Sequence, residues 1–144
     1  MKPPAPGMRA AHSVATTDRD SAEAFGNPGV RVVATPALIG FLETAAHRCL
    51  ESAYEPGEGS VGTHVDVHHL AAAPAGATIE ASAEVTAVEG RRVRFAVAAR
   101  WGDTLLMQGT HERARSAVRC SGVLACPFSS WHSERARAPV EAQP

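Results

Sequence analysis

The length, composition and charge of the chain exclude several classes of protein. Its 144 residues suit one domain with a sizeable core and are too few for two. Lys and Arg number 14 and Asp and Glu 15, so a net charge of −1 provides no long-range field to attract nucleic acid or an anionic membrane. The sequence shows no apolar run approaching the roughly 18 residues of a membrane span and no charged-then-apolar leader, so we expect a cytoplasmic location.

The three cysteines predict neither a disulfide framework nor a metal site. Cys120 and Cys126 are too far apart for a C-x-x-C motif, and the sequence has no second pair. Cys49 falls in an apolar helical pattern, where we interpret it as a small hydrophobic residue. We therefore expect no zinc and no redox chemistry.

Composition separates a central domain from two flanking segments. Residues 1–11 are rich in Pro and Ala and predict a disordered N-terminal segment. Residues 12–118 form the predicted domain, which opens with a short strand over 12–16 and a loop or lid over 17–29. Residues 119–144 have no periodic pattern and predict a C-terminal tail of low order.

The segment from Thr35 to Tyr54 predicts the one long helix of the chain. Thr35 followed by Pro36 is typical of an N-cap with proline at the first helical position, where its missing N–H costs nothing. Apolar residues recur at three- and four-residue spacing and predict a buried stripe. Its members are Leu38, Leu42, Ala45, Cys49 and Ala53, flanked by Ile39, Ala46 and Leu50.

After the helix, the sequence predicts four strands linked by turns. The run EPGEGSVG ends the helix and turns the chain back, and apolar residues then alternate over 63–70, 77–88, 92–101 and 104–118. Gly90 and Gly102 mark tight hairpins between the last three strands. The pattern indicates an α+β protein in which one antiparallel sheet wraps around a helix, and an exposed strand edge would favour dimerisation.

Glu43 is a candidate acid or base. At about 100° per residue it lies at the margin of the helix stripe, close to Leu50 in projection. A carboxyl held at the edge of a core is in an environment that often tunes a working acid or base. The alternative is that its side chain reaches solvent or pairs with His47, one turn further on.

The strand predicted over 63–70 carries histidines on both faces. His69 shares its face with two valines that should contact the helix, so it is a candidate general acid or base; the alternative is a core histidine bonded to a backbone carbonyl. His64, Asp66 and His68 share the opposite face. Residues i and i+4 of a strand are ~13 Å apart and cannot reach one ion, so we interpret these three as a solvated polar face.

Several separated motifs resemble one known family. The runs VVATPALIGFLETAA, EPGEGSVGTHVDVHHLAAAPAG, VEGRRVRFAV and GTHERA, in this order over roughly residues 30–115, are similar to the hot-dog-fold acyl-CoA thioesterases related to fluoroacetyl-CoA thioesterase. The resemblance implies a hot-dog sheet around the central helix and a homodimer. It also implies hydrolysis of a small acyl-CoA or carrier-bound acyl thioester, with no metal or bound cofactor.

The same resemblance assigns roles to individual residues. Thr35, Glu43 and His69 match the functional Thr, Glu and His of the family, and Gly62 and Arg113 match substrate-contacting positions. By this resemblance Glu43 attacks the thioester carbonyl or activates water, the imidazole moves the proton, and the Thr hydroxyl with the glycine N–H or the helix N-terminus stabilises the oxyanion. The arginine is a fixed cation for CoA phosphate or the thioester; the alternative is a surface arginine on an edge strand.

Two observations limit the assignment. Thr35 and Glu43 are eight residues apart, which separates their backbones by ~12 Å on one helix, so we hypothesise a site built from two subunits. Residues 18–30 do not repeat the aromatic-rich lid of the fluoroacetyl enzyme, so fluorine selectivity is not implied. The alternative functions are a non-catalytic hot-dog module that binds acyl-CoA or only dimerises, and a hot-dog hydratase or dehydratase.

Overall fold

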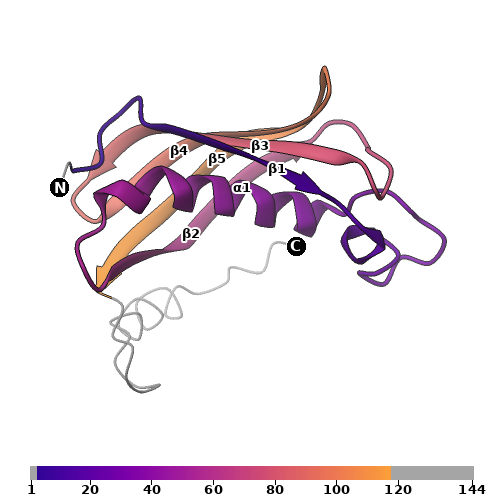
Figure 1. The fold of residues 1–144 in the computed structure, drawn as a ribbon, viewed down its shortest axis with the longest axis horizontal. Helices are drawn as coiled ribbons and strands as arrows, with labels where there is room; N and C mark the ends of the chain where they lie inside the picture. Colours follow the sequence, from indigo (N-terminus) through magenta and orange to yellow (C-terminus); the bar gives the residue numbers. More distant parts are fainter. Residues whose placement is uncertain (1–2, 118–144) are drawn as a thin grey trace, which may run out of the picture.

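The computed structural model describes residues 3–117, in which one curved sheet wraps around a single long helix (Figure 1). In chain order the elements are β1 (Arg9–Ala15), the 3-10 turn η1 (Asp18–Asp20), α1 (Thr35–Leu50), the 3-10 turn η2 (Glu51–Ala53), β2 (Glu58–His69), β3 (Thr78–Glu89), β4 (Arg92–Trp101) and β5 (Thr104–Ala117). The strand order is β1-β3-β4-β5-β2, and every neighbouring pair is antiparallel. The predicted α+β architecture is confirmed.

The core lies between α1 and the sheet because apolar side chains alternate along β3 and β4. Alternate strand residues point toward the helix, and the helix stripe faces them. The largest buried side chains include Leu38, Leu42, Leu50, Ile79, Phe95 and Leu106. Each contributes roughly 1.5–3 kcal/mol by leaving water, so the helix is held mainly by its apolar stripe.

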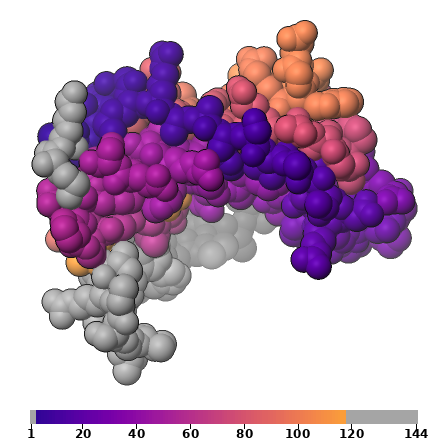
Figure 2. Space-filling model, viewed as in Figure 1, coloured from indigo at the N-terminus to yellow at the C-terminus, as the bar shows by residue number. Residues whose placement is uncertain are grey.

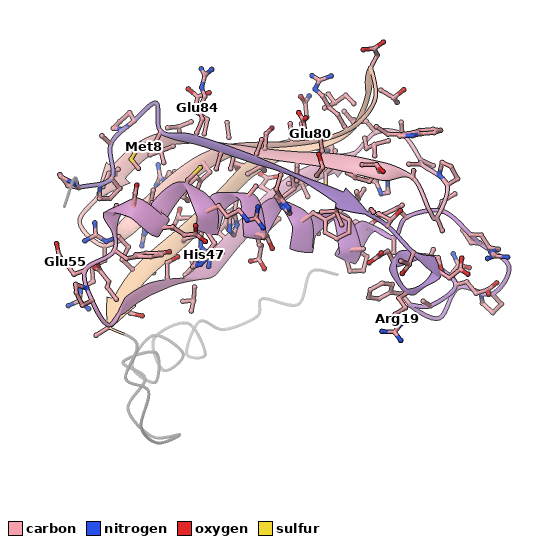
Figure 3. All side chains as sticks on the ribbon, in the orientation of Figure 1. Met8, Arg19, His47, Glu55, Glu80 and Glu84 are labelled. Carbon is pink, nitrogen blue, oxygen red and sulfur yellow. The ribbon has the colours of Figure 1, made fainter. Side chains whose placement is uncertain are left out.

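The opposite face of the sheet is polar. Figure 3 shows Glu80 and Glu84 of β3 on the side away from α1. Glu84 pairs with Arg9 of β1 at 3.2 Å, and Glu112 of β5 pairs with Arg92 of β4 at 2.9 Å. An antiparallel sheet with one apolar and one solvated face needs a helix on the apolar side only.

The helix begins and ends differently from the prediction. Ala34 is the N-cap and Thr35 is the first helical residue, so the prediction that Thr35 caps the helix was wrong. Pro36 fits the second helical position equally well, because first-turn N–H groups have no intrahelical partner. The helix ends at Leu50, and η2 replaces the predicted last turn. No helix within residues 3–117 is long and apolar enough to cross a membrane.

β1 starts earlier than predicted. Arg9–Ala11 pair with β3, and the Gly7 N–H donates to the Val85 carbonyl at 2.9 Å, so the predicted disorder over 1–11 is wrong for this stretch. The strand has no fully buried side chain, which is why no apolar period marks it in the sequence. The predicted tail over 119–144 lies outside the described residues.

Residues 16–34 form a loop that is tied to the rest of the fold. Thr17 caps η1, and isolated bridges join Ser21 to Val33 and Val32 to Pro74. Figure 2 shows β1 and α1 on one face of the molecule, with this loop at one end. Val33 and Ala34 are buried, so the loop delivers the start of α1 to a fixed place.

β2 is an edge strand that exposes apolar side chains. Val61 and Val65 are each 38% exposed, and β5 is its only neighbour among the described strands. Backbone groups along such an edge can pair with another chain.

Candidate active site

Thr35 and His69 meet at the N-terminal end of α1. The Thr35 Oγ1 lies 2.7 Å from the His69 Nδ1, and both residues are exposed. The alternative that His69 is a core histidine bonded to a backbone carbonyl was therefore wrong. The first-turn N–H groups of a helix lack intrahelical partners and carry partial positive charge. A hydroxyl, an imidazole and a helix N-terminus are thus gathered in one place.

Glu43 lies two turns further along α1, against a different part of β2. Its side chain is 42% exposed, and its Oε1 is 3.9 Å from the Nε2 of His111. The alternative pairing with His47 was wrong, because His47 contacts the Tyr54 hydroxyl at 3.2 Å and Glu51 at 3.9 Å. The carboxyl therefore faces the sheet rather than its own helix.

Gly62 makes room for the Glu43 carboxyl. A Cβ on Gly62 would overlap the Glu43 Oε1 and lie 3.1 Å from the His111 ring. The pairing of β2 with β5 shifts register between Gly62 and His64, which places Gly62 opposite the buried Arg113. The sequence predicted strict alternation of the two faces from Thr63 onward. The register shift interrupts that alternation, because a bulge changes which residues face the helix.

His111 is a functional candidate that the sequence reasoning missed. It is 2% exposed and stacks on Phe95 at a ring distance of 6.1 Å. Burial lowers the pKa of His111, while its hydrogen bond with the His64 carbonyl and the charge of Glu43 act to raise that pKa. The signal was available, because His111 and Arg113 are two residues apart on one strand and must share a face.

Arg113 supports the turn of helix that carries Glu43. It is 8% exposed, and its Nε and Nη2 donate to the Ser60 hydroxyl and carbonyl at 2.8 and 2.9 Å. Its Nη1 donates to the Glu43 carbonyl at 3.4 Å. Burial lowers the pKa of Arg113, and Tyr54 and Glu43 act to raise that pKa. The surface-arginine alternative was wrong, and contact with CoA stays a prediction.

The predicted catalytic residues thus form two groups within one chain. Thr35 and His69 form the first, and Glu43 and Gly62, backed by His111, form the second. Along one helix the backbones of Thr35 and Glu43 are separated by ~12 Å. This separation keeps the two groups apart along α1.

One polar cluster and one groove of the described residues lie apart from these side chains. His64, Asp66 and His68 are exposed, and no group of three or more His, Cys, Asp or Glu side chains within residues 3–117 is arranged to hold a metal. A groove of about 640 Å³ lies along β1, β3, β4 and β5, lined by residues such as Ser82, Ala96 and Gln108. The chemistry-bearing side chains lie elsewhere, beside α1 and β2.

The curved sheet around one long helix, with its polar groups between that helix and an edge strand, defines a hot-dog-fold protein. A hypothetical protein from Thermus thermophilus, described as a thioesterase superfamily member, has the same fold, with a TM-score of 0.74 at 24% identity over 95% of this chain and 94% of that one. Residues 16–116 match the family model of the fluoroacetyl-CoA-specific thioesterase FlK. The chain belongs to the FlK family, which confirms both the fold and the resemblance.

Individual relatives support this membership. The fluoroacetyl-CoA thioesterase of Streptantibioticus cattleyicolor is 46% identical over 83 residues, which cover 58% of this chain and 60% of the length of that relative. A point mutant of FlK solved with fluoroacetate and CoA is 35% identical over 81% of this chain and 96% of that one, with a TM-score of 0.73. A second FlK mutant, solved with acetyl-CoA, is 30% identical over 94% and 99%, with a TM-score of 0.75.

Proposed function

We propose that this protein hydrolyses a small acyl-CoA thioester to the free acid and CoA. The observation that carries the proposal is the Thr35 hydroxyl bonded to the His69 imidazole at a helix N-terminus, with the Glu43 carboxyl fitted over Gly62. Membership of the FlK family and the acetyl-CoA and CoA complexes of FlK support this substrate class. Because free acyl-CoA is a cytoplasmic metabolite, we propose the same location for the protein.

The proposed active unit is a homodimer paired through β2. When the same strand of two subunits pairs antiparallel about a twofold axis, the residue numbers of any two residues that face each other add up to the same value. Pairing centred between Val65 and Asp66 sets Gly62 of one subunit opposite His69 of the other, so Glu43 of one subunit approaches the Thr35–His69 pair of its partner. Exposed Val61 and Val65 on the open edge favour such pairing.

In this composite site each group has a defined task. The His69 Nδ1–H donates to the Thr35 Oγ1, which leaves the hydroxyl hydrogen and the helix N-terminus to stabilise the carbonyl oxygen as it becomes negative. Glu43 either attacks the carbonyl carbon or takes a proton from the attacking water. If Glu43 acts as the base, the C–S bond breaks and the proton taken from water passes from Glu43 through the His69 Nε2 to the CoA sulfur, which leaves as a thiol. If Glu43 is the nucleophile, CoA leaves as a thiolate and water then hydrolyses the Glu43–acyl anhydride, which frees the acid and the carboxylate.

The acyl group is proposed to be small, without selectivity for fluorine. The loop over residues 16–34 carries one aromatic residue, Phe25, which is 56% exposed, so this loop supplies no aromatic lid. Acetyl-CoA, fluoroacetyl-CoA and propionyl-CoA are therefore expected to react with kcat/KM values within roughly 200-fold of each other, which is the largest discrimination that one methylene usually gives.

The test is release of free thiol from a panel of acyl-CoAs. Wild-type protein should release thiol, and Glu43→Gln and His69→Ala should abolish release, whereas Thr35→Ser keeps the hydroxyl and should retain measurable activity. Silence of the wild-type protein across the panel would identify a non-catalytic module. A 3-hydroxyacyl or enoyl product without thiol would identify a hydratase or dehydratase.

A further inference from the structure

His111 is a buried histidine with one unsatisfied ring nitrogen. The ring packs against Phe95 of β4 inside the sheet–helix interface. Its Nε2 is fully buried and has no hydrogen-bond partner among residues 3–117, and the Glu43 Oε1 lies 3.9 Å away. A buried polar atom without a partner is costly, so this nitrogen calls for an explanation beyond filling space.

The other ring nitrogen fixes the tautomer. The His111 Nδ1 lies 2.9 Å from the His64 carbonyl oxygen, and a carbonyl can only accept, so Nδ1 carries a proton. In the neutral ring, Nε2 then presents a lone pair to the Glu43 carboxyl. A lone pair and a carboxylate cannot bond unless a proton lies between them.

Glu43 is the anionic group that faces this nitrogen. From β5 itself the charged neighbour is Arg113, from β2 the titratable neighbour is His64, and from β4 the ring contact is the uncharged Phe95. Arg113 and His64 oppose a positive charge on the imidazole, and Glu43 favours it. The charge on His111 therefore depends on Glu43.

We propose that His111 is a positioning residue for Glu43, holding the carboxyl over Gly62 through a proton shared at Nε2. The consequence for catalysis rests on the proposed thioesterase function, but the proton sharing does not. The ring is itself rigid, because Phe95 and the His64 carbonyl fix its plane. The carboxyl is thereby held in one orientation although its side chain is 42% exposed.

The first test reads the proton directly and needs no activity. Protein labelled with ¹⁵N at its seven histidines is titrated by NMR, and His111→Asn identifies the His111 signals. We expect Nδ1 to stay protonated throughout and Nε2 to titrate. In Glu43→Gln the pKa of His111 should fall by at least about 0.5, because the charge that favours the imidazolium is gone. An unchanged titration in Glu43→Gln, or a proton on Nε2 alone, would overturn the proposal.

The second test measures the effect on turnover. His111→Asn keeps a donor for the His64 carbonyl and removes the atom facing Glu43, so kcat should fall roughly 10–100-fold with KM within about twofold. The pH–rate profile of His111→Asn should also lose the ionisation that the NMR titration assigns to the His111 Nε2, because asparagine does not titrate. His111→Gln places an N–H near the lost Nε2 and should recover part of kcat.

A matched control separates this role from general damage to the fold. His12→Asn removes another half-buried imidazole that contacts α1, through the Phe41 carbonyl at 3.0 Å, and should keep the wild-type pH profile. His111→Asn with wild-type kcat and profile would refute the positioning role. If the wild-type protein releases no thiol, the proposed function fails, and the NMR titration alone decides the inference.

Discussion

At Gly62, the lack of a side chain lets the Glu43 carboxyl rest against the edge of the sheet. A Cβ there would overlap the Glu43 Oε1, whereas a Cβ on Gly40 of α1 would meet nothing within 4 Å. We expect Gly62→Ala to lower kcat roughly 10–100-fold by displacing the carboxyl, a misplacement of about 1 Å being enough for such a loss. Thiol release and thermal unfolding measure the effect.

The control for this substitution is Gly40→Ala, which adds the same methyl group to α1, the helix that carries Glu43. It should leave kcat unchanged and raise the free energy of unfolding by about 0.5–1 kcal/mol, because alanine is the better helix former. Equal kcat for Gly62→Ala and wild type would show that the Glu43 position found here is not the working one.

Cys49 illustrates a residue whose chemistry is suppressed by its surroundings. Burial raises the pKa of its thiol to about 11, and the Sγ contacts the Ala83 carbonyl at 3.2 Å. At pH 8 the thiolate fraction is then about one in a thousand, so native protein should resist alkylation at Cys49 and react there only when unfolded. Peptide mass spectrometry after iodoacetamide treatment measures this, and rapid native labelling would contradict the burial.

At the scale of elements, regular patterns were predictable and irregular ones were not. Periodicity located α1, β3, β4 and β5 because one face of each is buried. It could not place the register shift after Gly62, because a bulge depends on pairing with β5 rather than on local sequence. Periodicity also could not decide which residue caps the helix, since a proline in the first turn is compatible with either Ala34 or Thr35 as the N-cap.

The start of β2 offers a prediction on stability. The pKa of Glu58 is lowered chiefly by the hydrogen bond that it accepts from the Glu55 N–H. Arg115 of β5, whose Nη2 lies 3.1 Å from the Glu58 Oε1, lowers it further. A carboxyl whose pKa is lower in the folded state stabilises the fold at pH values above its unfolded pKa of about 4.3. This stabilisation is lost as the pH falls through the folded-state pKa. Glu58→Gln should therefore lower the free energy of unfolding by about 0.5 kcal/mol at pH 7, after allowing for solvent screening, with no difference near pH 2.

Urea unfolding at the two pH values measures this difference. Glu80→Gln, which removes an exposed carboxylate from the outer face, is the matched control and should unfold like wild type at both pH values. A deficit in Glu58→Gln that persists at low pH would point to lost packing instead of lost charge.

At the scale of the whole molecule, the sequence residues that match the family separate into two groups, and one chain does not unite them. The sequence alone supplied the candidate site residues and, from the separation of Thr35 and Glu43 along a helix, the hypothesis of a site built from two subunits. It could not show that β2 ends as an open edge with Val61 and Val65 exposed, because strand order is set by long-range pairing. That edge is what makes a composite site feasible.

Subunit complementation tests the composite site. Glu43→Gln and His69→Ala are each expected to be inactive, but a dimer containing one of each has one site with both an intact Glu43 and an intact His69. Random pairing makes about half of the dimers hybrids, each with one working site of two, so the mixture should recover about a quarter of wild-type activity. If each site lay within one chain, both sites of the hybrid would be defective and nothing would be recovered. Co-expression with two affinity tags yields the hybrid for assay, and pairing Glu43→Gln with the Glu43→Gln/His69→Ala double variant is the control, because no site in that hybrid has the carboxyl.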